Sequence, residues 1–323
     1  MRRAGLIAAL AGAVALLFVA SLAAGKVWVP AAAWFSHDPR WFIIAELRLP
    51  RALLGLAIGA GLGLSGAVLQ GYLRNPLADP AVLGVSSSAA LGAVAAIVLA
   101  GVTTPLPLFV AAMLCAGAAL ALLALLAWRA GGAVALILAG TVLASLSGAL
   151  TAFLISIAPN PFATAEVIDW IMGALTDRSF AEAQLALPCI AAGSILLLAT
   201  GRGLDALSLG EDAARSMGVN LTQLQLLVVT GTALIVGASV AVTGVVGFVG
   251  MIVPHLMRPL AGARPSALLV PSALGGAALV LAADSLVRLA PGASEVRLGV
   301  AMALIGTPFF FALLLKMRRS AWI

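Results

Sequence analysis

Residues 50–72 read PRALLGLAIGAGLGLSGAVLQGY, an almost unbroken apolar run whose only charged side chain, Arg51, stands at its start. At 1.5 Å per residue, about 20 such residues cross the roughly 30 Å hydrocarbon core of a bilayer. Inside hydrocarbon every backbone polar group must be paired within the chain, so only helices and closed barrels can span it. Barrel strands alternate apolar and polar residues. This continuous run therefore predicts a membrane-spanning helix.

The composition extends this prediction to the whole chain. Of 323 residues, 63% are hydrophobic and 9% are charged, and the mean hydropathy is +1.17. A soluble domain carries roughly 25% charged residues, so we expect a single all-α transmembrane domain over residues 1–323. The apolar runs predict about ten spans, near 4–25, 50–72, 80–100, 106–127, 133–157, 183–200, 223–242, 244–262, 267–286 and 298–316. The first run follows Met1 and two arginines like a signal peptide, but it is too long for one and is interpreted as an uncleaved span.

The basic residues predict the orientation of these spans. With the N-terminus inside, 11 of the 18 lysines and arginines fall on the cytoplasmic side, at Arg2, Arg3, Arg74, Arg129, Arg202, Arg215, Arg258, Arg264, Lys316, Arg318 and Arg319. Cytoplasmic ends are enriched in these residues, so both termini are expected in the cytoplasm. The net charge of +6 is scattered over span ends rather than gathered on one surface, and it does not indicate a nucleic-acid partner.

Two stretches of the chain resemble each other. Residues 58–68 (IGAGLGLSGAV) match residues 236–246 (VGASVAVTGVV), and the same offset pairs Pro76 with Pro254. Chance similarity between helices rich in glycine and alanine is the alternative. If the repeat is real, its copies lie in spans that run in opposite directions. Inverted repeats are typical of transporters.

A membrane enzyme and an ion-coupled carrier are the competing classes, and each would need its own catalytic or energy-coupling residues. The two histidines, His37 and His255, form no metal-ligand pair, and Gly25-Lys26 lacks the glycine spacing of a phosphate-binding loop. No acidic residue stands deep in a predicted span, where a carrier binds its ion; Asp284 lies near an outer end and can pair with Arg288 four residues on. The pattern favours a transporter driven by a separate subunit. No metal or cofactor is expected on this chain.

Several motifs follow one another along the chain: Arg48-Leu-Pro-Arg51, residues 64–70 (LSGAVLQ), residues 74–80 (RNPLADP), residues 83–86 (LGVS), residues 209–219 (LGEDAARSMGV), residues 247–255 (GFVGMIVPH), residues 283–288 (ADSLVR) and residues 306–310 (GTPFF). They resemble those of the FecCD-type permeases, which include the vitamin B12, haem and siderophore importers. The similarity covers roughly residues 45–316. The resemblance implies a type II ABC importer permease in a bacterial inner membrane. It implies a homodimer, two cytoplasmic ATPase subunits that bind ATP and Mg²⁺, and a periplasmic binding protein; an ion-coupled or other non-ABC carrier is the alternative.

The resemblance also implies roles for individual residues. Arg48, Arg51 and Arg288 match arginines that dock the binding protein. The segment 205–221 matches a cytoplasmic loop that couples to the ATPase through Leu209, Gly210, Glu211, Asp212, Ala213, Ala214, Arg215 and Gly218. Gly218 suits a helix C-terminal turn. Asn75 and Leu77 match a cytoplasmic gate, and the proline after Asn75 favours a turn there. Lipid headgroups are the alternative partners of the outer arginines, and Gln70 could line a pathway or bond to neighbouring helices.

Overall fold

The computed structural model describes residues 3–36, 38–130, 133–291 and 295–320. Arg2 and His37 lie outside the described residues, as do the side chains of Arg129, Lys316, Arg318 and Arg319. Within the described residues the fold is helical and contains no strand. The all-α prediction is therefore confirmed for the part of the chain that can be seen.

The long helices follow the predicted apolar runs, and short helices connect them. In chain order the elements are α1 (Arg3–Ala23), η1 (Ala31–Ala33), η2 (Ile43–Arg48), α2 (Leu49–Tyr72), η3 (Pro80–Leu83), α3 (Val85–Ala100), α4 (Pro105–Ala130), α5 (Ala133–Ser156), α6 (Pro161–Ile171), α7 (Phe180–Ala199), α8 (Gly201–Leu207), α9 (Glu211–Ser216), α10 (Leu221–Thr243), α11 (Val249–Ala261), α12 (Pro265–Leu289) and α13 (Leu298–Ser320).

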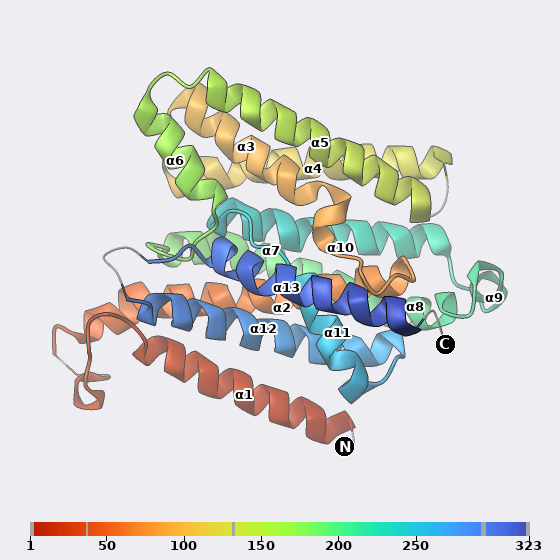
Figure 1. Cartoon of the computed structure of the whole chain (residues 1–323), viewed down its shortest axis with the longest axis horizontal. Helices are drawn as coiled ribbons and strands as arrows, with labels where there is room; N and C mark the ends of the chain where they lie inside the picture. The colour runs from red at the N-terminus through yellow and green to blue at the C-terminus, as the bar shows by residue number, and fades with distance from the viewer. Residues whose placement is uncertain (1–2, 37, 131–132, 292–294, 321–323) are drawn as a thin grey trace.

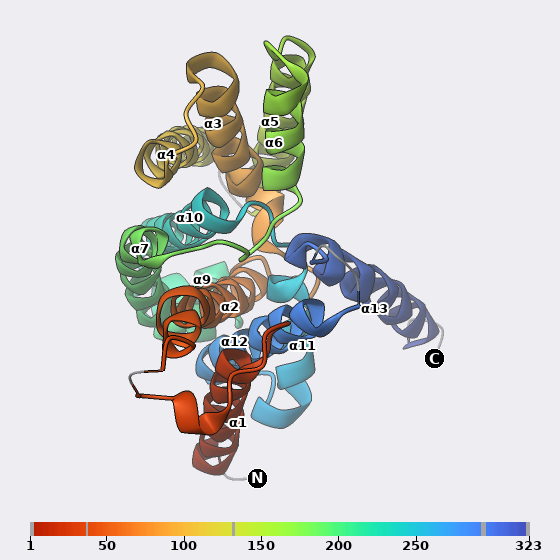
Figure 2. The same cartoon turned by 90° about the vertical axis from the view of Figure 1, so that its left-hand side faces the viewer.

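The long helices run side by side, with α2 and α10 at the centre (Figure 1). In the apolar window of each central helix 78% of the residues are buried, against 17% in α1 at the edge. Helices α3, α4 and α5 form a group on one side of this centre, and α1 packs against α12 on the other (Figure 2). Helix α1 begins, and α13 ends, at the end of the bundle where α8 and α9 lie (Figure 1).

Small residues on α2 allow its neighbours to approach closely, as the glycines of this run predict. A Cβ atom at Gly59 or Gly63 would overlap the backbone of α12, and one at Gly66 would overlap the backbone of Gly250 in α11. Gly55 differs, because a Cβ there would make only ordinary contacts with leucine and valine side chains. Three of the four glycines are thus required by backbone packing.

Within the described residues, seven of the ten expected spans are helices long and apolar enough to cross a membrane: α1, η2 with α2, α4, α5, α7, α10 and α12. Two shorter apolar helices, Val85–Ala100 and Leu298–Leu313, correspond to predicted spans. The predicted span at 244–262 is wrong as a full crossing, because α11 has only 13 residues, about 20 Å at 1.5 Å per residue.

Irregular backbone explains why α11 is short. Residues 244–248 are not helical, and Gly244 and Phe248 both have positive φ angles, of 71° and 67°. Non-helical backbone is tolerated at membrane depth only where protein or a water-filled cavity surrounds it. Hydropathy alone cannot detect such a break, because residues 244–250 (GVVGFVG) are as apolar as a helix would be.

The two copies of the sequence repeat lie in α2 and α10, which run antiparallel (Figure 1). They also occupy equivalent places, since both are central and equally buried. This arrangement is what an inverted repeat requires.

Candidate functional site

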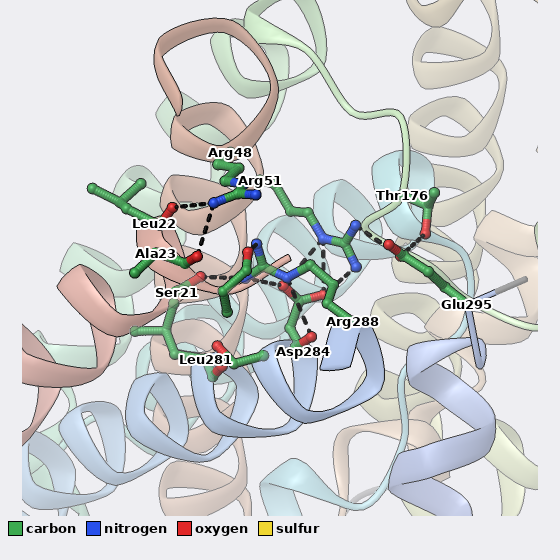
Figure 3. A network of polar contacts seen from close by, with 12 residues as sticks. Ser21, Leu22, Ala23, Arg48, Arg51, Thr176, Leu281, Asp284, Arg288 and Glu295 are labelled. Carbon is green, nitrogen blue, oxygen red and sulfur yellow. Dashed lines mark hydrogen bonds and ion pairs between the residues drawn. The ribbon is translucent and has the colours of Figure 1, made fainter. Parts of the chain in front are cut away.

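The predicted docking arginines meet at one end of the bundle in a single network of charged side chains (Figure 3). Asp284 of α12 is its centre. Arg51 of α2 donates to both carboxylate oxygens of Asp284, with Nε distances of 3.0 and 3.1 Å and an Nη2 distance of 2.8 Å. Arg288, one turn further along α12, approaches the same carboxylate at 2.9 Å. The predicted Asp284–Arg288 pair is confirmed.

Arg48 and Arg288 tie this network to the end of α1. Arg48 donates to the carbonyl oxygens of Leu22, Ala23 and Val27 at 3.0, 2.9 and 2.6 Å. Arg288 donates to the Ser21 hydroxyl at 2.5 Å. Carbonyl oxygens at the end of a helix lack partners within it, so Arg48 satisfies partly buried carbonyl groups that have no partner in α1.

Glu295 completes the network from the segment between α12 and α13. Its Oε2 accepts from Arg51 Nη1 at 2.9 Å and from the Thr176 hydroxyl at 3.1 Å. Burial acts to raise the pKa of Glu295, but the charge and hydrogen bond of Arg51 and the bond from Thr176 outweigh it, so this pKa is lowered. Counting Arg48, Arg51 and Arg288 against Asp284 and Glu295, three positive and two negative charges leave a net charge of +1.

Docking another protein needs accessible side chains, but these three arginines are buried. Arg48, Arg51 and Arg288 are only 6%, 8% and 3% exposed, and their partners belong to this chain. The sequence places all three at span ends, which is correct, but it shows a carboxylate partner only for Arg288, because Asp284 lies in the same helix. Arg51 and Asp284 are 233 residues apart, so only the packing of α2 on α12 brings them together. The docking role stays a prediction.

The predicted coupling loop forms two short helices at the opposite end of the bundle, where α9 projects outward (Figure 1). Ala214 is fully buried, whereas Leu209 and Met217 are 71% and 53% exposed. Glu211 and Asp212 lie 3.6 and 3.7 Å from Arg215. The loop thus presents apolar and charged side chains together, a mixture suited to a protein partner.

Glycines delimit α9. Gly210 precedes the helix and Gly218 follows it, with φ angles of 112° and 81°. The N–H of Val219, one residue beyond Gly218, donates to the Ala214 carbonyl at 3.0 Å, which closes the last turn. A glycine in the left-handed region commonly ends a helix in this way. The predicted helix C-terminal turn at Gly218 is confirmed.

The predicted gate residues lie in a tight turn after α2. The Asn75 Oδ1 accepts from the Leu77 N–H at 2.9 Å, and the Ala78 N–H donates to the Asn75 carbonyl at 3.1 Å. The turn predicted from the proline after Asn75 is confirmed, and gating itself stays a prediction. Gln70 bonds to neighbouring backbone, donating to the carbonyls of Gly250 and Met251 at 3.3 and 3.4 Å.

A cavity of about 790 Å³ beside this turn has no counterpart in the sequence-based reasoning. Four arginines line it, contributed by the end of α2, by α8, by α11 and by the start of α12: Arg74, Arg202, Arg258 and Arg264. From the sequence, each of these arginines indicates only which side of the membrane a span end faces. Their spacing along the chain gives no sign that they meet, so this feature could not be found before the structure.

The fold and its two ends define a class of protein. In the described part of the chain, seven helices are long and apolar enough to cross a membrane, and no group of three His, Cys, Asp or Glu side chains could hold a metal ion. A central pair of antiparallel repeat helices is the architecture of membrane transport proteins.

The chain belongs to the FecCD transport family, whose profile matches residues 13–316. It is 40% identical over 276 residues to the cobalamin import system permease protein BtuC of Halobacterium salinarum, covering 84% of this chain and 73% of that one. It is 38% identical over 292 residues to the hemin transport system permease protein HmuU of Yersinia pestis, covering 88% and 86%. Among solved structures it matches an inward-facing transporter assigned to the metal-chelate type of ABC transporter, with a TM-score of 0.86, 32% identity and coverage of 97% and 99%.

Proposed function

We propose that this chain is the transmembrane permease subunit of an ATP-driven ABC importer that passes an iron chelate or cobalamin. The observation that carries the proposal is α9, a short helix with exposed charged side chains that is flanked by the exposed apolar residues Leu209 and Met217, in a chain of the FecCD family. The sequence has no phosphate-binding loop of its own. A separate ATPase that docks on α9 would supply the energy.

The cargo proposal rests on the relatives. One is named for cobalamin import and another for hemin transport, and the similar solved structure is of the metal-chelate type. These are bulky solutes, and a transport pathway that is lined by apolar side chains and has no fixed ligands for a small ion would suit them. Iron chelates, including siderophores and haem, and cobalamin therefore form the substrate class.

The orientation and partners follow from the ends of the bundle. We place the end with α8 and α9 in the cytoplasm of a bacterial inner membrane, because lysine and arginine favour that side. Both termini then lie inside with the ATPase subunits, and a periplasmic binding protein approaches the other end. A second copy of the chain completes the pathway, with Asn75 and Leu77 at its cytoplasmic gate.

Docking by Arg48, Arg51 and Arg288 would require an exchange of partners. A carboxylate of the binding protein would compete with Asp284 and Glu295 for guanidinium groups that are already satisfied. The net charge of +1 on the network favours an approaching anion. Glu295 is the accessible member, with its side chain 22% exposed.

Uptake into proteoliposomes tests the proposal. The chain is reconstituted with its ATPase and binding protein, and haem, a ferric siderophore and cyanocobalamin are offered in turn, with and without ATP inside. Uptake of one solute that needs ATP and survives an ionophore is the expected result. Uptake that an ionophore abolishes and that proceeds without ATP would establish the ion-coupled alternative instead.

The coupling role of α9 is tested by Arg215→Glu, because this exposed side chain can be changed without disturbing the core. The variant is expected to lose association with the ATPase subunit in a pull-down. Arg40→Glu, equally a surface change but at the other end of the bundle, is the matched control. Equal ATPase binding by both variants would contradict the assignment.

A further inference from the structure

The cavity beside α8 is lined by cations at its mouth and by apolar groups within. Its inner wall includes Ala67 of α2 and Leu268 of α12, each 3% exposed. Its mouth carries Arg74 and Arg264, whose side chains are 50% and 74% exposed. A cavity that is apolar inside and basic at its mouth matches an amphiphile with an anionic head.

The acidic residues nearby offset only part of this charge. Asp205 is fully occupied, because Arg264 Nε donates to its Oδ2 at 2.7 Å and the N–H of Ser266 donates to its Oδ1 at 2.9 Å. Glu211 stays 3.9 Å from Arg74, well beyond the 2.7–2.9 Å of a charge-assisted hydrogen bond.

Two of the arginines are left without a carboxylate. Arg258 donates only to the neutral Gln70 Oε1, at 2.9 Å. Arg202 makes no hydrogen bond or ion pair with any residue that the structure describes. Like charges that share a cavity wall repel one another unless an anion joins them.

We propose that this cavity binds the phosphate of an acidic glycerophospholipid, with Arg202 and Arg258 as its principal ligands. Guanidinium groups bind phosphate oxygens bidentately, and basic pockets at the cytoplasmic ends of membrane helices suit anionic headgroups. A free phosphate would satisfy the arginines but leave the apolar inner wall empty. The cavity lies at the ends of α2 and α12, two helices long and apolar enough to cross a membrane, so we expect it near the level of the headgroups.

The test measures lipid binding to the full-length chain in neutral detergent by native mass spectrometry. Phosphatidylglycerol, phosphatidylcholine and inorganic phosphate are titrated separately. Each arginine near an anionic headgroup contributes about 1 kcal/mol, so Arg202→Gln should weaken phosphatidylglycerol binding about 5-fold, and Arg202→Gln with Arg258→Gln about 30-fold. Arg40→Gln, which removes an arginine from the other end, should have no effect.

The single variant guards against a folding artefact, since the Arg202 side chain has no partner in the described chain to lose. Unchanged phosphatidylglycerol binding in both variants would overturn the proposal. Arginine-dependent binding of inorganic phosphate as tight as that of phosphatidylglycerol would replace the lipid by a soluble anion. Loss of ATPase association without any loss of lipid binding would make the cavity a protein-docking surface and would also overturn it. None of these outcomes depends on uptake, so the proposed transport function is tested separately.

Discussion

Arginines gather at both ends of the bundle, but their burial and their partners differ between the two ends. At the end that holds Asp284, three arginines are almost completely buried and every one donates to an acceptor in the same chain. At the end that holds α8, four arginines surround a cavity, and two of them have no carboxylate partner. The first group holds helices together, whereas in the second group Arg202 and Arg258 have no carboxylate partner among the described residues.

The difference follows from where the carboxylates lie. Asp284 stands one turn before Arg288 in α12 and faces Arg51 of α2, so one buried anion serves two cations. Asp205 stands in the short helix α8 and is used up by Arg264 and by the N–H of Ser266. The residue type alone therefore does not indicate the role of an arginine. Its guanidinium group stabilises the fold where acceptors of the same chain surround it, and it can bind an external anion where they do not.

Removing Asp284, the carboxylate shared by two buried arginines, should have the largest effect on stability and is the strongest test of the difference between the two ends. Asp284→Ala leaves Arg51 and Arg288 buried without their shared carboxylate, and breaking a buried pair costs about 3–5 kcal/mol. The expected loss is measured as the free energy of unfolding in mixed micelles titrated with a denaturing detergent. Asp38→Ala, which removes the partly exposed partner of the exposed Arg40, should cost less than about 1 kcal/mol. Equal losses in the two variants would show that burial does not set the difference.

Crowding the same end without changing its charge should have the next largest effect. A side chain at Gly25 would overlap the Arg48 guanidinium, so Gly25→Val should displace that arginine from the carbonyls at the end of α1. Overpacking costs about 1–3 kcal/mol, measured by the same unfolding titration. Gly101→Val is a useful control, because nothing lies within 4 Å of a Cβ there although its φ angle is also positive. A smaller loss for Gly25→Val than for Gly101→Val would contradict the packing assignment.

Lowering the pH should weaken the buried network through the protonation of Glu295, and this gives a further test of the difference between the two ends. Its pKa is lowered in the folded chain, so its contribution to stability is present above its ordinary pKa of 4.5 and is lost as the pH falls through the lower folded value. Glu295→Gln should lower stability at pH 7 by about 1 kcal/mol, in the range of a hydrogen bond to a charged group that is partly exposed. The difference from the unaltered chain should shrink below pH 4. A difference that is the same at both pH values would rule out this linkage.

The smallest effect is expected at the cavity mouth. Arg264→Gln removes an ion pair whose arginine side chain is 74% exposed, and such pairs contribute about 0.2–1 kcal/mol. Unfolding titrations of this variant should therefore fall close to those of the unaltered chain. Added salt should reduce even this difference, because exposed charges are screened. A loss comparable to that of Asp284→Ala would mean that the two ends are not distinct.

Some parts of the site could be read from local sequence because their partners are local. Asp284 and Arg288 are four residues apart in one helix, and the turn at Asn75 depends on the proline that follows it. Gly218 ends α9 within a single turn. Each was predicted and each is confirmed. The break before α11 was missed for the opposite reason, since residues 244–250 are apolar throughout and hydropathy does not distinguish a helix from an enclosed irregular segment.

Composition and the length of the apolar runs were enough to determine that this protein is a helical membrane protein, because a bilayer admits few other ways of pairing the backbone. The motifs were enough to place it among the FecCD transporters. Only the tertiary structure decided which arginines are buried and hold neighbouring helices together, and which line an open cavity. The reason is physical: the state of a charge depends on acceptors and solvent that surround it in space, and for Arg51 the decisive carboxylate lies 233 residues away along the chain.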